Sequence, residues 1–485
     1  MKILLIAIPV VDLFEGRFLQ IGMDYRKQNP PTGLYSLATI INLNGYKVEI
    51  ADLIANGIDS FIKYLNRIEE FDLIGLGATS FSWPTAIYCI NEIRKKTNKI
   101  PIVLGGIHPT MFDYYILSKG KVNFIIRGEA ETAILKLLEY LRGQRQIESV
   151  NNLTYINHAG KIIRNQIDKL IDINEVPPPD YSVLPTNLYL SLSIESSRGC
   201  PFNCIFCSTM YRKTYRALRP LRFVNNLEYV QSFLGKTINK TIYIIDDEFT
   251  INKNRVTRIM YEIEKRKLNV KLRFDARIPD INNLKMIESV IPFLDRFLIG
   301  AECGYDDGLE KIGKKINIKQ IEESARILHS YDISHLCDFS FVIGFPWEKY
   351  DDVIKTIEFA SKLFVKYNIN VYLQYYMQLP GSILWEEQRK NGVLSEALYD
   401  NFGLFNNPYI FRTGVNFKIE EFETISEIVA AIRIAYKLGG LHDYNDIYYS
   451  HPLVLRNYFN TVHKTYQDKT GFHSLVECSH GKLKP

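Results

Sequence analysis

The sequence is poor in cysteine, in long apolar runs and in net charge. Each of these shortages argues against a class of protein. Its seven cysteines are few and unevenly spaced, which fits a reducing compartment. No uninterrupted apolar stretch reaches the length of a membrane-spanning helix. The apolar N-terminus, Met1–Pro9, is short and lacks a small-residue cleavage site, so it is predicted to be a buried first strand rather than a signal peptide.

The net charge of +5 is small for 485 residues, and no stretch forms a long run of lysine and arginine. Charge therefore does not favour nucleic acid as a partner. The length exceeds one ordinary core, and two or three domains are expected. Together these features predict a cytoplasmic enzyme that binds no nucleic acid and has no membrane span.

Three of the cysteines, Cys200, Cys204 and Cys207, lie within eight positions at C-x3-C-x2-C spacing. They follow an alternating apolar run, Leu190–Glu195, that is typical of a strand. Thiolates this close together are soft ligands that select zinc or an iron–sulfur cluster. A structural zinc site needs four ligands, and no second Cys or His pair stands at finger-like spacing. Three thiolates suit a cubane cluster with one iron left open for a substrate.

Residues 1–145 alternate short β-rich runs with helical patterns, which predicts a Rossmann-like, doubly wound parallel sheet. The expected strands are Lys2–Ile8, Lys47–Ala51, Leu73–Gly77, Ile102–Leu104 and Asn123–Ile126. The expected helices are Gly33–Asn44, Ile58–Glu69, Pro84–Thr97 and Glu129–Leu141. Such sheets bind ligands at the carboxyl ends of their strands. The candidate residues in those loops are Thr79, Ser80, Gly105, Gly106, His108, Arg127, Gly128 and Glu129, although a tight turn or a packed side chain explains each one taken singly.

Residues 146–189 are predicted to form a hairpin, Asn151–Ile156 with Lys161–Arg164, and then an extended linker through Pro177–Pro179. Residues 190–381 alternate strands and helices again, which predicts a partial (β/α)6 barrel with its chemistry at the carboxyl ends of the strands. The expected strands are Leu190–Glu195, Thr241–Asp246, Lys271–Phe274, Phe297–Ala301, Asp338–Ile343 and Asn370–Tyr376. The expected helices are Arg255–Arg266, Ile281–Val290, Ile318–Ser330 and Asp352–Val365.

Residues 382–485 are predicted to form a mainly helical segment that closes the barrel. Phe422–Leu438 has the spacing of an amphipathic helix, and Leu453–Tyr466 is basic and aromatic. His473, Cys478 and His480 allow a metal site to be imagined, but scattered residues of these types near a terminus are usually unremarkable.

Informative residues follow the barrel strands. Asp246, Asp247 and Glu248 end the second strand, where a role in capping a helix is the alternative to a role in binding. Asp275 and Arg277 end the third strand and either pair with each other or hold a charged group. The remaining candidates are Glu302 and Cys303, the latter read as a small hydrophobic residue, then Gly344 and Pro346, and Gln374 and Tyr376 on the last strand.

The cysteine spacing, with Phe206 before the last cysteine, resembles the radical S-adenosylmethionine (SAM) family. The resemblance implies that Cys200, Cys204 and Cys207 hold a 4Fe-4S cluster whose fourth iron binds SAM. It places Phe206, Asp246, Asp247, Glu302, Gly344 and Pro346 beside SAM. Reductive cleavage of SAM would yield a 5′-deoxyadenosyl radical, with the electron drawn from an external donor such as flavodoxin or ferredoxin.

The front region, with its loops and Pro30–Gly33, resembles the cobalamin-binding domain that precedes many radical SAM cores. This implies cobalamin held by the eight loop residues named above, and methylation of an unactivated carbon through methylcobalamin. The sequence lacks Asp-x-His-x-x-Gly, the motif that supplies a histidine to cobalt in cobalamin mutases and methyl transferases. If cobalamin binds, the resemblance implies a base-off form with its tail buried in this sheet.

Several alternatives stay open from sequence. They are a cobalamin-assisted rearrangement or cyclisation, a front domain that no longer binds cobalamin, an iron–sulfur electron carrier or sensor, and a zinc-stabilised binding module. The substrate cannot be read, although a small molecule is favoured over a peptide because nothing resembles a peptide-recognition domain.

Overall fold

The computed structural model describes residues 1–10, 12–14, 17–19, 29–237, 239–392 and 394–400, together with positions 418, 421, 424, 425, 428 and 429. The predicted helix Phe422–Leu438 falls largely outside this part of the chain, and Leu453–Tyr466, His473, Cys478 and His480 fall wholly outside it. Among the helices of the described residues, none combines the length and apolarity needed to cross a bilayer.

The front domain is built on a seven-stranded sheet in the order β4-β1-β5-β6-β7-β8-β9. The first five strands in this order run parallel. The strand order reverses between β1 and β5, and sheets of this kind bind ligands at such a point. These strands are β1 (Lys2–Ala7), β4 (Lys47–Asp52), β5 (Leu73–Gly77), β6 (Ile102–Gly105) and β7 (Phe124–Ile126).

Helices cover both faces of this sheet. Along β1, Leu4 and Ile6 face one hydrophobic core while Ile3 and Leu5 face the other, as the alternation of a buried strand requires. One core contains α1 (Thr32–Leu43) and α7 (Glu131–Leu141); the other contains α3 (Phe61–Leu65), α4 (Trp83–Lys96) and α6 (Asp113–Ser118). Shorter elements are α2 (Leu53–Asn56), α5 (Ile107–Met111), η2 (Ile58–Ser60), η3 (Ile68–Glu70) and η4 (Ile147–Ser149), and β2 (Asp12–Phe14) pairs with β3 (Arg17–Leu19).

Two details of this domain differ from the sequence prediction. The expected helix Ile58–Glu69 is broken into η2, α3 and η3. The hairpin of β8 (Leu153–Ile156) and β9 (Ile162–Arg164) pairs antiparallel with β7 and so extends the front sheet rather than standing in a linker.

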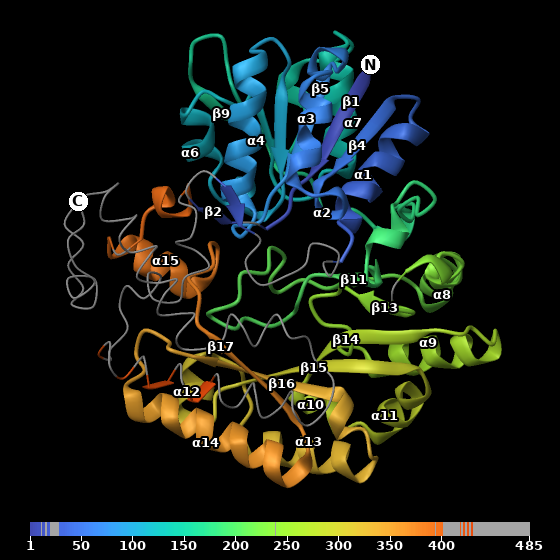
Figure 1. Cartoon of the computed structure of the whole chain (residues 1–485), viewed down its shortest axis with the longest axis vertical. Helices are drawn as coiled ribbons and strands as arrows, with labels where there is room; N and C mark the ends of the chain where they lie inside the picture. Colours follow the sequence, from blue (N-terminus) through green and yellow to red (C-terminus); the bar gives the residue numbers. More distant parts are fainter. Residues whose placement is uncertain are drawn as a thin grey trace.

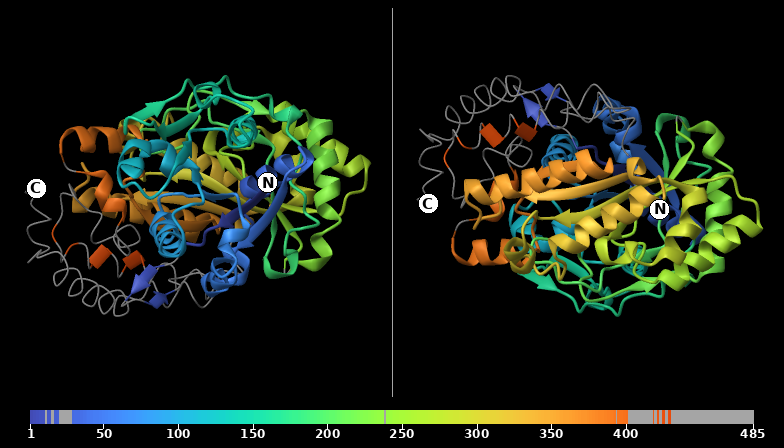
Figure 2. Two further views of the ribbon diagram at one scale, coloured as in Figure 1. Left: turned by 90° about the horizontal axis from the view of Figure 1, so that it is seen from above. Right: turned by 90° about the horizontal axis from the view of Figure 1, so that it is seen from below.

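The second half of the chain forms six parallel strands in the order β10-β13-β14-β15-β16-β17, as expected for a partial (β/α)6 barrel. Most of its helices lie on the face away from the front domain, and the first two flank the sheet at the right of Figure 1 (Figure 1, and from below in Figure 2). The strands are β10 (Leu192–Ile194), β13 (Thr241–Ile244), β14 (Lys271–Arg277), β15 (Leu294–Glu302), β16 (Cys337–Ile343) and β17 (Asn370–Tyr375). The helices are α8 (Pro220–Gln231), α9 (Lys253–Lys265), α10 (Ile278–Ile281), α11 (Leu284–Val290), α12 (Asp306–Lys311), α13 (Ile318–Ser330) and α14 (Tyr350–Tyr367). The predicted α/β fold class is confirmed.

Beyond the barrel the chain returns to the front domain. Trp385 in α15 (Ile383–Lys390) and Tyr399 in η10 (Glu396–Asp400) are buried in the same hydrophobic core as the front-domain helices. The Trp385 indole N–H donates to the Tyr399 hydroxyl at 2.6 Å, and the Trp83 indole N–H donates to Asp400 at 2.8 Å. The residues that follow the barrel, Trp385 and Tyr399 among them, therefore pack against the front domain.

Candidate functional site

The carboxyl ends of the two sheets face one cavity of about 680 Å3. From the front domain it is lined by the segments that follow β1, β5, β6 and β7, and from the barrel by the start of the cysteine loop and the segment after β13. Of the residues proposed from sequence, the lining includes Thr79, Gly105, Gly106, Gly128, Glu129 and Asp247. Front-domain candidates and one barrel candidate, Asp247, thus line the same cavity, whereas the three cysteines are not part of its lining.

The start of the cysteine loop contacts the segment that follows the last cysteine. The Cys200 N–H donates to the Tyr211 carbonyl at 3.2 Å, and Gly199 has a φ of +85°. A Cβ at Gly199 would lie 2.8 Å from the carbonyl oxygens of Tyr211 and Thr214. Glycine is therefore required just before the first cysteine, because both the backbone conformation and the close approach exclude a side chain.

The three cysteine thiols are half-buried and free of disulfides. Among the described residues, no three His, Cys, Asp or Glu side chains stand ready to hold a metal ion. Burial raises the pKa of Cys200 to about 11, with Glu248 and Cys207 adding to it, and burial also raises the pKa of Cys207, with Cys204 adding to it. Thiols this close to one another ionise when a metal neutralises them, and a donor set of sulfur alone suits iron–sulfur chemistry.

Asp246 anchors the segment that leads into the cysteine loop. Its buried carboxylate accepts the N–H and the hydroxyl of both Ser196 and Ser197, at 2.5 to 2.9 Å. Four donors occupy all the lone-pair positions of a carboxylate, so Asp246 has no capacity left for SAM. Its neighbour Asp247 accepts the Gly199 N–H at 3.1 Å and lines the cavity. The two adjacent acids therefore have different partners within the protein.

Glu302, at the end of β15, binds a lysine that sequence reasoning missed. The Lys314 ammonium lies 2.7 Å from Glu302, both side chains are buried, and Glu302 has a φ of +70°. Burial opposes the charge on Lys314, but Glu302 and Cys204 outweigh it and raise the pKa of the lysine. Arg277 donates to the Lys314 carbonyl at 2.8 Å, and its guanidinium lies 3.4 Å from the centroid of the Phe202 ring in the cysteine loop. This places a buried ion pair beside the cysteine loop.

The other barrel candidates have separate partners. Asp275 accepts a hydrogen bond from the Tyr243 hydroxyl, so it does not share the partners of Arg277. Cys303 is fully buried in the barrel core, as expected of a small hydrophobic residue. Gln374 lies 3.5 Å from the Ser340 hydroxyl, and the Tyr376 ring packs 5.1 Å from that of Phe345.

The loop after β16 is shaped by Glu348, which the sequence did not single out. Its buried carboxylate accepts the backbone N–H of Gly344 at 2.6 Å and that of Phe345 at 2.9 Å, and the Tyr305 hydroxyl at 2.9 Å. Gly344 has a φ of +81°, and Pro346 follows in the same loop. The Phe345 ring lies 5.6 Å from that of Phe206, so this loop packs directly on the cysteine loop.

Glu348 should make stability depend on pH. Burial raises its pKa from 4.5 to about 7 against the opposing hydrogen bonds, so between these values the folded protein keeps a proton that the unfolded chain has released. Its contribution to stability is complete below pH 4.5 and is lost as the pH rises through about 7. The Tm of the wild type should therefore fall relative to the Tm of Glu348→Gln as the pH rises from about 5 to 8. Thermal unfolding of the apo-protein measures this difference. A Tm difference that does not change with pH would contradict the raised pKa.

Three of the expected cobalamin residues point elsewhere. The His108 imidazole lies 3.0 Å from the Ser80 hydroxyl and stacks on Trp83, with ring centroids 4.7 Å apart. Burial lowers the pKa of His108 to about 3, so the ring is neutral. Arg127 lies 3.7 Å from Asp113 and borders a second, smaller cavity. Ser80, His108 and Arg127 thus organise the domain rather than line the large cavity, and the period-2 pattern of a strand does not predict which way a loop side chain turns.

Gly106 is the most constrained residue of the front loops. It has a φ of +92°, and a Cβ there would lie 2.7 Å from the Ala78 carbonyl oxygen. The loops after β5 and β6 can therefore touch only if residue 106 has no side chain. This contact forms part of the cavity wall.

Comparison with known families agrees with this division of the chain. Residues 21–138 match the model of the B12 binding domain, and residues 194–360 match that of the radical SAM superfamily.

Individual proteins are also similar. An uncharacterized methyltransferase of Pyrococcus horikoshii is 27% identical over 481 residues, which is 96% of this chain and 99% of that protein. The anaerobic magnesium-protoporphyrin IX monomethyl ester cyclase of Rubrivivax gelatinosus is 26% identical over 356 residues, 68% of this chain and 62% of the cyclase. One solved structure is that of the cobalamin-dependent S-adenosylmethionine radical enzyme OxsB, with aqua-cobalamin and S-adenosylmethionine bound. It superposes on this chain with a TM-score of 0.71 and 17% sequence identity. The superposition covers 96% of this chain and 71% of OxsB. At that identity the likeness shows the fold.

Proposed function

We propose that this chain, whose residues 21–138 match the B12 binding domain and residues 194–360 the radical SAM superfamily, methylates an unactivated carbon of a small molecule. The observation that carries this proposal is the cavity of about 680 Å3 at the ends of the front strands, whose walls come from both domains. A cofactor held at the front strand ends would face the cysteine loop directly. The similarity to an uncharacterized methyltransferase over nearly its whole length supports the same reaction.

We assign Cys200, Cys204 and Cys207 as the ligands of three irons of a 4Fe-4S cluster, with SAM on the fourth. A cluster held by these three cysteines would supply the electron for reductive cleavage of SAM to methionine and a 5′-deoxyadenosyl radical. The family requires an external reductant, and we propose a flavodoxin or ferredoxin. Thiolate ligands of this kind persist in a reducing compartment, which supports the cytoplasm.

The barrel residues hold the loop and receive SAM. Asp247 fixes the Gly199 N–H, and Asp246 fixes the two serines ahead of it, so the loop is positioned before any ligand arrives. The buried Glu302–Lys314 pair, beside the cysteine loop, would offer one charge of each sign to the amino-acid end of SAM. Phe206 with Gly344 and Pro346 supplies an apolar wall for adenine, and aromatic packing there excludes water.

In the front domain, Thr79, Gly105, Gly106 and Gly128 present backbone and a small hydroxyl to the cavity, which suits close approach of a large flat ligand. Bound cobalamin would serve as the carrier of a methyl group between SAM and the substrate. The neutral imidazole of His108 is buried away from the cavity, in agreement with the absence of Asp-x-His-x-x-Gly from the sequence.

A second candidate function is cobalamin-assisted cyclisation. It is favoured by the similarity to the monomethyl ester cyclase, which covers 68% of this chain. The two functions differ in whether a methyl group of SAM reaches the product, so SAM labelled in that methyl group distinguishes them.

The proposal is tested by anaerobic reconstitution with iron, sulfide and hydroxocobalamin, followed by gel filtration and an absorbance spectrum. We expect cluster and corrin bands to elute with the protein, and 5′-deoxyadenosine to form on addition of SAM and a chemical reductant. A colourless protein that contains zinc and no iron would overturn the proposal. Cleavage of SAM without retention of the corrin band would remove methylation and leave the radical chemistry.

A further inference from the structure

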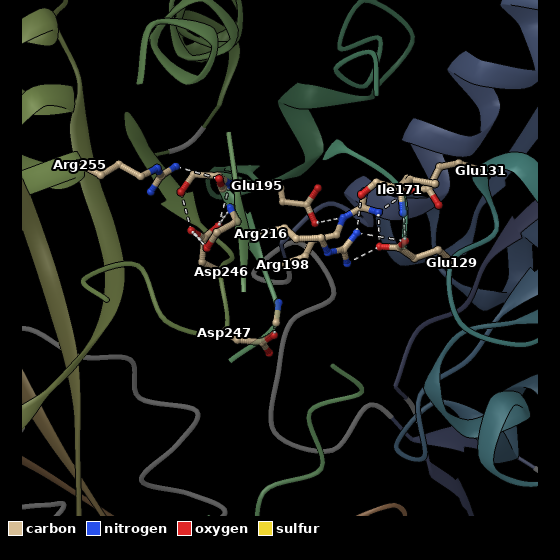
Figure 3. A network of polar contacts seen from close by, with 12 residues as sticks. Glu129, Glu131, Ile171, Glu195, Arg198, Arg216, Asp246, Asp247 and Arg255 are labelled. Carbon is tan, nitrogen blue, oxygen red and sulfur yellow. Dashed lines mark hydrogen bonds and ion pairs between the residues drawn. The ribbon is translucent and has the colours of Figure 1, made fainter. Parts of the chain in front are cut away.

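Glu129 is held by residues from outside its own domain. It follows β7, and its carboxylate is contacted by both guanidinium nitrogens Nη1 and Nη2 of Arg216, at 3.2 and 2.6 Å, and by Nη1 of Arg198 at 3.1 Å (Figure 3). The Ile171 N–H adds a fourth contact at 3.1 Å. Although Glu129 borders the cavity, its carboxylate is committed to these donors, which differs from the cobalamin contact expected from sequence.

The two arginines stand at the base of the cysteine loop. Arg198 in β11 (Ser197–Arg198) pairs directly with Arg216 in β12 (Arg216–Ala217), and the chain between these strands contains all three cysteines. Arg198 also donates to Glu131, the first residue of α7, at 2.6 Å, and to Glu195 at 2.7 Å. Front-domain carboxylates therefore bind both strands, β11 and β12, that flank the cysteine loop.

Burial makes this network costly to break. The exposed fractions of the side chains are 7% for Glu129, 15% for Arg198 and 19% for Arg216. Removing one partner from a buried ion pair leaves the other charge desolvated and unpaired, whereas exposed pairs contribute little. Arg216 and Arg198, with the Ile171 N–H, outweigh burial and lower the pKa of Glu129.

We propose that Glu129, Arg198 and Arg216 form an inter-domain latch that sets the position of the front-domain cofactor loops relative to the cysteine loop. This inference rests on the proposed function, since it concerns how two cofactor sites face each other across one cavity. The three are positioning residues. Cleavage of SAM needs the barrel and its cluster, whereas transfer of the SAM methyl group to cobalamin needs both domains in register, so the latch acts on the second process.

The test compares two products of SAM in reconstituted wild type and Glu129→Gln, without a substrate. One is 5′-deoxyadenosine formed with a chemical reductant, and the other is S-adenosylhomocysteine formed with chemically reduced cobalamin. In the variant we expect S-adenosylhomocysteine formation to fall about tenfold or more, the scale for removing one partner of a buried pair, while 5′-deoxyadenosine stays within about twofold. Limited proteolysis of the apo-protein should also cut the stretch 165–190 faster in the variant.

A matched control is Asp338→Asn, which removes an ion pair of 2.7 Å to Arg296 that lies within the barrel. It should leave the ratio of the two products unchanged. Arg216→Gln is the second variant, for use if Glu129→Gln does not fold. It should likewise lower S-adenosylhomocysteine formation while leaving 5′-deoxyadenosine formation within about twofold. Equal loss of both products, or an unchanged ratio in a folded Glu129 or Arg216 variant, would overturn the latch. A wild type that retains no corrin or forms no S-adenosylhomocysteine would instead overturn the proposed function.

Discussion

Replacing Cys204 by alanine should abolish the release of 5′-deoxyadenosine from SAM. Two thiolates cannot hold three irons, so the cluster is lost or labile and no electron reaches the sulfonium. We expect a fall of about 100-fold or more, since even groups that merely support a metal ligand contribute up to that factor. The fold should persist, because the neighbouring Ile205 N–H is held by the Ile312 carbonyl at 3.1 Å.

The measurement is product formation by chromatography, together with iron content and circular dichroism. Cys337→Ala is the matched control, because Cys337 is buried at the start of β16, at the end of the barrel away from the site. It should keep its iron and its activity. Unchanged cleavage of SAM by the Cys204 variant would refute the ligand assignment.

Replacing Gly106 by alanine should weaken corrin binding. The new Cβ would lie 2.7 Å from the Ala78 carbonyl oxygen, in a backbone conformation with positive φ, so the loops after β5 and β6 must separate. Displacement of the cavity wall should lower the affinity for hydroxocobalamin about tenfold or more, since strained positions of this kind cost on the order of 1–3 kcal/mol before any clash is counted.

Retention of the corrin band through gel filtration, titrated against added hydroxocobalamin, checks this expectation. Gly45→Ala is the control: Gly45 lies in the same domain with a φ of +81°, but nothing lies within 4 Å of its added Cβ. It shares the backbone strain without the contact and should bind corrin normally. Normal binding by the Gly106 variant would show that this wall does not hold the cofactor.

The strands were predictable because they are buried apolar runs bounded by turns. Leu73–Gly77 matches β5 residue for residue, and Ile318–Ser330 matches α13. The helix α8 was not among the helices named from sequence, although Pro220 at its first turn is a start signal and Phe223, Leu227 and Val230 follow at helical spacing. Ile58–Glu69 has helical spacing but breaks into short turns, since packing against the sheet outweighs a weak propensity.

The site was predictable in place but not in detail. Strand order puts the loops of Gly105, Asp247 and Glu302 at carboxyl ends, and the structure finds them there. Spacing cannot show that Asp246 turns to the serines while Asp247 turns to Gly199, because adjacent residues point opposite ways and either direction is allowed. Nor can it show that Glu129 meets Arg198, a contact across 69 positions that exists only after the two domains have docked.

The return of residues 385–400 to the front domain bears on how the protein is made. Trp385, Leu394 and Tyr399 belong to the core of the front domain, which precedes the barrel along the chain. Because chains emerge from the ribosome from the N-terminus, that core stays incomplete until Trp385 and Tyr399, which follow the barrel, have been translated. The cysteine loop is by then outside the ribosome. Completion of the front domain is therefore a late event in synthesis, and it coincides with the first moment at which both cofactor sites exist.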